Sequence, residues 1–218
     1  MSEEPPSERH SPVGEPVVRA DPEVTGERAA EAVGFDPTDP DSVSEAADTV
    51  ARFAAGAVGG DDHVLMLRGA AACAALVRGE GSYKAAAERA GEAVSVSFIR
   101  KWARVHDLPQ AIRRHVARGH IAPTAAKHIA RVGGDDRYLL AWAVLDGDLT
   151  VREIRSAASA VNDGADAEDA LREAGVVPGR LTLDLPVAEY VELRRRASMR
   201  NEEPGAVVAD ALREYFSE

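Results

Sequence analysis

Residues 82–106 read Ser82-Tyr-Lys-Ala-Ala-Ala-Glu-Arg-Ala-Gly-Glu-Ala-Val-Ser-Val-Ser-Phe-Ile-Arg-Lys-Trp-Ala-Arg-Val-His106. Ser82 is a suitable N-cap for an alanine-lined helix that ends at Gly91. Ser97 can cap a second helix, in which the apolar residues from Phe98 to Val105 recur at helical spacing. The stretch therefore predicts two short helices joined by a turn.

Two helices joined in this way form the helix-turn-helix pattern. Its second helix is narrow enough to enter the major groove of DNA, so residues near its start meet base edges while flanking groups hold phosphates. Arg100, Lys101 and Arg104 lie on or beside one face of the expected second helix. We therefore expect this helix to be the recognition helix of a DNA-binding domain.

Positive charge is concentrated around this helix. Residues 98–131 include eight Lys or Arg and one acid, Asp107, in a chain with a net charge of -11. Phosphate neutralisation supplies most non-specific DNA affinity, so such a block is the pattern expected beside a recognition helix. A solvated helical face is the alternative interpretation. The candidate DNA-binding residues are Lys84, Ser95, Ser97, Phe98, Arg100, Lys101, Arg104, Arg113, Arg114, Arg118, Lys127 and Arg131.

The surrounding sequence predicts a mainly α fold. We expect a multi-helix domain over residues 41–162, with its helix-turn-helix core beginning at residue 80. Its first and last helices are expected to begin with capping boxes, Ser42 with Glu45 and Thr150 with Glu153. Glycine and proline separate the segments between them, and none of these segments shows the alternation of apolar and polar residues that is typical of a strand.

Three phrases in this domain carry a family resemblance: Ser97-Phe-Ile-Arg-Lys-Trp-Ala-Arg-Val-His-Asp-Leu-Pro109, Arg118-Gly-His-Ile-Ala-Pro-Thr-Ala-Ala-Lys-His-Ile-Ala130 and Leu149-Thr-Val-Arg-Glu-Ile154. In order and spacing they resemble the helix-turn-helix domain of ParB/KorB partition proteins, over about residues 80–160. The resemblance implies that Ser97 starts the recognition helix, that Ile99 is buried in it, and that Arg100 and Lys101 face DNA.

The chain also departs from that family. The stretch from Gly91 to Pro109 is about two residues longer than usual. We find no counterpart of the family's nucleotide-binding domain before residue 80, so we expect no CTP or ATP binding.

The C-terminal region contains one alternating segment, Arg180-Leu-Thr-Leu-Asp-Leu-Pro186, followed by two helical patterns. It resembles a ribbon-helix-helix module over residues 179–218, in which one strand from each of two chains pairs. That resemblance implies a homodimer, because a lone strand has unpaired edges. Asp184 is unfavourable beside phosphates, so we expect dimerisation rather than DNA reading. The expected dimer residues are Leu181, Leu183, Leu185, Tyr190, Leu193, Val207, Val208, Leu212 and Phe216.

Acidic residues are concentrated at the start of the chain. Residues 1–62 contain 15 Asp or Glu against 4 Lys or Arg, whereas residues 63–218 contain 22 of each. Residues 1–40, rich in proline, are expected to form a disordered tail, which could compete with DNA for the cationic face. Residues 163–178 are expected to be an acidic linker. The balance of 23 arginines to three lysines resembles that of proteins from halophiles.

Several classes of protein are disfavoured by the sequence. The single cysteine, Cys73, excludes an internal disulfide and indicates a reducing cytoplasm. The histidines between residues 106 and 128 fall on at least three segments without nearby cysteines, so we expect no metal. Nucleotide and hydrolase motifs are not found, so we expect no cofactor, no catalytic residue and no enzyme activity. No apolar run reaches the length of a membrane span, and the first residues lack the features of a secretory signal.

Together these features predict a cytoplasmic, nucleoid-associated protein that binds double-stranded DNA as a homodimer. Transcription regulation, DNA partition and DNA organisation are all compatible with this expectation. The alternative is a helical protein-protein interaction module that does not bind DNA, whose arginines balance the acidic tail.

Overall fold

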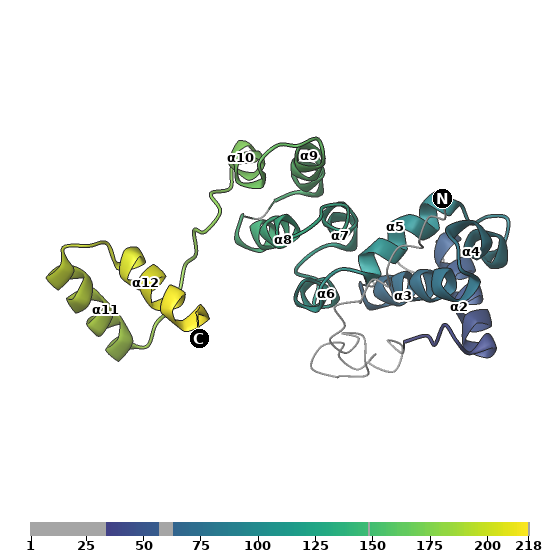
Figure 1. Ribbon diagram of the computed structural model, residues 1–218, viewed down its shortest axis with the longest axis horizontal. Helices are drawn as coiled ribbons and strands as arrows, with labels where there is room; N and C mark the ends of the chain where they lie inside the picture. Colours follow the sequence, from purple (N-terminus) through teal and green to yellow (C-terminus); the bar gives the residue numbers. More distant parts are fainter. Residues whose placement is uncertain (1–33, 57–62, 148, 218) are drawn as a thin grey trace, which may run out of the picture. The chain divides into compact units, whose positions relative to one another are not determined.

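The computed structural model describes residues 34–56, 63–147 and 149–217. Within these ranges it has 11 helices and no strand, so the predicted mainly α class is confirmed (Figure 1). The chain divides into two units, residues 1–179 and 180–218, which we describe separately. The expected tail lies outside the described residues up to position 33. The helices are α2 (Pro40–Ala54), α3 (His63–Glu80), α4 (Tyr83–Ala90), α5 (Val96–His106), α6 (Gln110–Ala117), α7 (Pro123–Ile129), α8 (Asp136–Gly147), α9 (Val151–Asn162), α10 (Ala167–Glu173), α11 (Val187–Arg200) and α12 (Pro204–Phe216).

Helix α3 is the centre of the first unit. Six consecutive small residues, Ala70 to Ala75 with Cys73 among them, are buried along it. It packs against α2, α4, α5, α6 and α7. Because these side chains are small, the neighbouring helices can approach the backbone of α3 closely while the interior stays densely packed.

An aromatic group joins α2 to α5 beside this helix. Gly69 of α3 lies against the ring of Phe53, and a Cβ at this position would overlap three atoms of that ring. The Phe53 ring packs in turn against Trp102 and Phe98 of α5, with centroid distances of 4.6 and 5.4 Å. Aromatic pairs at such distances stabilise a core beyond the area that they bury.

The helix ends test the predicted caps. Thr150 and Glu153 form the expected capping box: Glu153 N donates to Thr150 Oγ1 at 3.3 Å, and Thr150 N donates to Glu153 Oε2 at 2.8 Å. The prediction for Ser42 is wrong, because α2 begins at Pro40 with Asp39 as its N-cap. Asp39 accepts a hydrogen bond from Asp41 N, and proline is favourable in the first turn.

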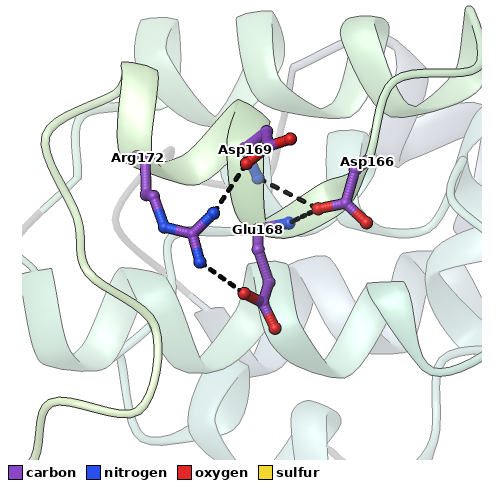
Figure 2. Close-up of polar contacts among 4 residues, drawn as sticks. All are labelled: Asp166, Glu168, Asp169 and Arg172. Atoms are coloured by element: carbon purple, nitrogen blue, oxygen red, sulfur yellow. Dashed lines mark hydrogen bonds and ion pairs between the residues drawn. The ribbon is translucent and has the colours of Figure 1, made fainter.

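The expected linker contains a helix. Asp166 caps α10 by accepting hydrogen bonds from the backbone N–H groups of Glu168 and Asp169, and Arg172 joins the two acidic side chains (Figure 2). On the other face Leu171 is fully buried, and α10 packs against α8 and α9. The acids that suggested a linker therefore occupy the cap and the exposed face of a packed helix.

The second unit does not support the predicted strand. Residues 180–186 have no regular secondary structure, because a strand needs hydrogen bonds to a second backbone segment and the described residues supply none there. Helices α11 and α12 follow and pack against each other, joined at Asn201 in the left-handed conformation with φ 53°. Ala197 and Val207 are the buried hydrophobic residues of the described part of this unit.

Charged residues surround the C-terminal end of α5. Arg78 of α3 forms an ion pair with Asp107, the C-cap of α5, at 3.4 Å. Burial, together with the charges of Arg113 and Arg78, lowers the pKa of His106 to about 3. A neutral imidazole is therefore enclosed where α3, α5 and α6 meet.

We expect Gly69→Ala to lower the free energy of unfolding by about 1–3 kcal/mol, because the added Cβ overlaps the Phe53 ring. Gly133→Ala is the control, since no atom lies within 4 Å of a Cβ at that position. Urea denaturation followed by circular dichroism measures both variants. Equal stabilities would contradict the close packing of α2 on α3.

The pH dependence of stability should report His106. Its pKa is lowered in the folded state, so between about pH 6.5 and its folded value the unfolded chain binds the additional proton. Stability is therefore lost as the pH falls through this window. His106→Gln should weaken that dependence in urea titrations at several pH values, and parallel profiles for the two proteins would show that His106 is not enclosed as a neutral group.

Candidate nucleic-acid interface

Helices α4 and α5 form the expected pair joined by a turn. Ser82 caps α4 by accepting a hydrogen bond from Ala85 N at 3.1 Å, and Gly91 ends it with φ 110°. Buried Val94 holds the turn against the core. These features agree with the predicted positions of α4 and of the turn.

The cap of α5 differs from the prediction. Ser95 is the N-cap and accepts a hydrogen bond from Phe98 N at 3.1 Å. Ser97 lies within the first turn, exposed, with its hydroxyl 3.0 Å from that of Ser95. The predicted cap at Ser97 is thus two residues too late, although both serines lie at the exposed start of the helix.

Helix α5 has one buried and one exposed face. Ile99, Trp102 and Val105 are buried, whereas Arg100, Lys101 and Arg104 are exposed and form what we call the α5 face. None of these three cations makes an ion pair among the described residues. The buried face fixes the helix, so its free cations point away from the core.

Neighbouring rings limit where these cations lie. The Arg100 guanidinium lies 5.3 Å from the ring centroid of Tyr83, the first residue of α4. The Lys101 ammonium lies 5.9 Å from the ring centroid of Phe98. Phe98 itself is half-buried against Phe53. Its ring therefore belongs to the core and is a poor platform for stacking on a base.

The other candidate residues have different surroundings. Arg113 is buried, because α6 turns it toward the corner of α3 and α5, where burial lowers its pKa, the charge of Asp107 raises it and that of Arg78 lowers it. It cannot reach a ligand at the surface, which corrects its place in the predicted set. Lys84 is exposed, and its Nζ lies 3.8 Å from Oε1 of Glu88 on the same helix. Arg114 and Arg118 are exposed on α6 and just after it.

A second group of cations lies where α5, α7 and α9 meet. We call it the α7 cluster, and its members are Lys101, Lys127, Arg131 and Arg155. Burial lowers the pKa of His128, and the charges of all four members lower it further. The sequence had indicated the first three as candidate DNA-binding residues, but it did not indicate Arg155, and it assigned no role to His128. No sequence signal places them together, because their proximity depends on the packing of α9 on α7.

Other kinds of site are not evident in the described part of the chain. No group of three or more His, Cys, Asp or Glu side chains there could hold a metal ion. Burial raises the pKa of the Cys73 thiol to about 12. None of the described helices combines the length and apolar character needed to cross a membrane.

Comparison with known proteins identifies a family for most of the first unit. No curated protein and no solved structure matches the chain. Residues 36–176 match a family described as "Family of unknown function (DUF7119)". The matched range contains α2 to α10, including α4, α5 and the α7 cluster, and ends before the second unit. It covers more than half of the chain, and the protein therefore belongs to the DUF7119 family.

Proposed function

We propose that the first unit binds duplex DNA and that α5 enters the major groove. The observation that carries the proposal is the α5 face, on which three cations have no carboxylate partner among the described residues while the opposite face of the helix is buried. Arginine can form paired hydrogen bonds to guanine in the major groove. The exposed serines at the start of α5 can donate to phosphates.

The charge distribution supports binding to a polyanion. In a chain with a net charge of -11, residues 98–131 hold eight Lys or Arg against one acid, and four cations from α5, α7, the turn after α7, and α9 act together on His128. Phosphate neutralisation then supplies affinity that decreases with salt. A transcription regulator, a partition factor or a nucleoid-associated protein would use such a surface, and the proposal needs no cofactor.

We propose further that the second unit joins two chains. Its exposed large hydrophobic residues include Leu181 at 62%, Tyr190 at 52% and Phe216 at 75% relative exposure. A segment with so much exposed apolar surface and so small a core is unlike a stable isolated domain. Pairing residues 180–186 of two chains as a ribbon would satisfy both backbones and cover Leu181, Leu183 and Leu185.

Removal of the α5 face tests DNA binding. Arg100→Ala, Lys101→Ala and Arg104→Ala combined should raise the Kd for duplex DNA about 100-fold or more, because each lost contact costs about 1–3 kcal/mol. The matched control combines Arg52→Ala, Arg152→Ala and Arg172→Ala, three exposed positions on α2, α9 and α10. Fluorescence anisotropy gives the affinities and circular dichroism checks the fold. A similar loss in both triple variants would mean that only net charge matters, and no loss in either would contradict the proposal.

Substitution of the alternating leucines tests dimerisation. We expect Leu181→Asn, Leu183→Asn and Leu185→Asn combined to give a monomer in sedimentation velocity, because these side chains would lose the apolar interface. Thr182→Asn and Asp184→Asn, at the intervening positions, should leave the dimer intact. The monomer should bind a duplex with two half-sites more weakly, since linked readers can gain about 10²–10⁴ in avidity. A leucine variant that remains dimeric would place the interface elsewhere.

A further inference from the structure

The charges of the α7 cluster are unbalanced. Its members come from α5, α7, the turn after α7, and α9, and none has an ion-pair partner among the described residues. All the charges resolved as acting on His128 are positive. Like charges repel, so the cluster does not stabilise the free protein and favours an anion.

Packing holds part of this cluster in place. Lys127 lies with its Nζ 4.9 Å from the ring centroid of Trp102, a residue that is 4% exposed. Helix α7 packs against both α5 and α9. This packing brings Lys101, which precedes α7 in the chain, and Arg155, which follows it, close to His128. Burial lowers the pKa of Lys127, and the charge of Lys101 lowers it further. A partly desolvated cation attracts an anion more strongly than one in bulk water.

His128 sits among these charges with an unsatisfied atom. Its Nδ1 is buried and has no hydrogen-bond partner among the residues that the structure describes. Burial and the four positive charges lower its pKa, so the imidazole is neutral in the free protein at neutral pH. An anion held by the cluster would offset these charges and raise the pKa of His128 again.

We propose that the α7 cluster holds one phosphate diester of the nucleic-acid backbone, and that His128 takes up a proton from solvent when this site is filled. The inference rests on the proposed function and assigns one phosphate contact within it. Because the complex binds one more proton than the free protein, affinity should rise as the pH falls from the pKa of His128 in the complex toward its pKa in the free protein. Below the second value the proton is bound in both states and the gain is complete.

Arg155→Ala in the full-length protein tests the phosphate contact. The slope of log affinity against log salt concentration for a duplex should become shallower by about 0.9, the value for one phosphate. Arg152→Ala is the matched control, because it removes an exposed arginine from the same helix that is not among the charges acting on His128. The slope of the control should stay at the wild-type value. Equal slopes for Arg155→Ala and Arg152→Ala would overturn the assignment.

Nuclear magnetic resonance of the His128 imidazole tests the proton. In the free protein Arg155→Ala should raise the pKa of His128, since one of the four positive charges is gone. Adding duplex to the wild type should raise it as well, and affinity should increase about tenfold for each unit of that rise when the pH is lowered through the window. His128→Gln should lose this part of the pH dependence. A pKa of His128 that duplex leaves unchanged would overturn the proton uptake.

Failure of the site and failure of the proposed function give different results. If the wild type does not bind duplex at low salt, DNA binding is wrong, and inorganic phosphate and pyrophosphate become the probes of the cluster. A rise in the pKa of His128 with either probe that Arg155→Ala abolishes would identify a site for free phosphate and would overturn the assignment to a backbone phosphate. No rise with any probe would overturn the site as a whole.

Discussion

The close approach of α2, α3 and α5 around Gly69 is the constraint on which the first unit depends. The Phe53 ring occupies the space that a side chain at Gly69 would fill, and the same ring packs against Trp102 of α5. The exposed positions of α5 follow from this contact, because the face that includes Trp102 and Ile99 is turned into the core. The exposed position of Arg100, Lys101 and Arg104 is thus set by buried residues of the core and by Gly69, which has no side chain.

Local signals in the sequence predicted the helices well but not their exact starts. Ser82, Gly91 and the Thr150–Glu153 box act as their residue types suggest. Near α5 two serines stand two positions apart, and either can cap, so the choice of Ser95 depends on how Val94 packs. Helix α10 was missed because its acids resemble those of a linker, whereas its buried face is short and consists mainly of alanine and Leu171.

The candidate site was predictable as a charge pattern but not as a geometry. Arg113 and Arg114 are neighbours in sequence, yet one is buried beside Arg78 and the other is exposed, because α6 presents only one of them to the core. Arg155 joins Lys127 only through the packing of α9 on α7. Helical periodicity alone does not state which face of a short helix meets its neighbours, so these assignments required the tertiary structure.

Some cations of the chain form surface ion pairs, whereas those of the α7 cluster have no carboxylate partner among the described residues. Arg68, Arg89 and Arg172 lie beside carboxylates, as do most arginines of α11 and α12, and exposed pairs of this kind contribute little to stability. The chain has an excess of acids, so a carboxylate near the α7 cluster would be easy to supply, yet all the charges of described residues that are resolved as acting on His128 are positive. The charge of Lys101 lowers the pKa of Lys127, and the proposed anion would relieve the repulsion between these two cations. An anion that bound the cluster only in the folded state would therefore stabilise the first unit.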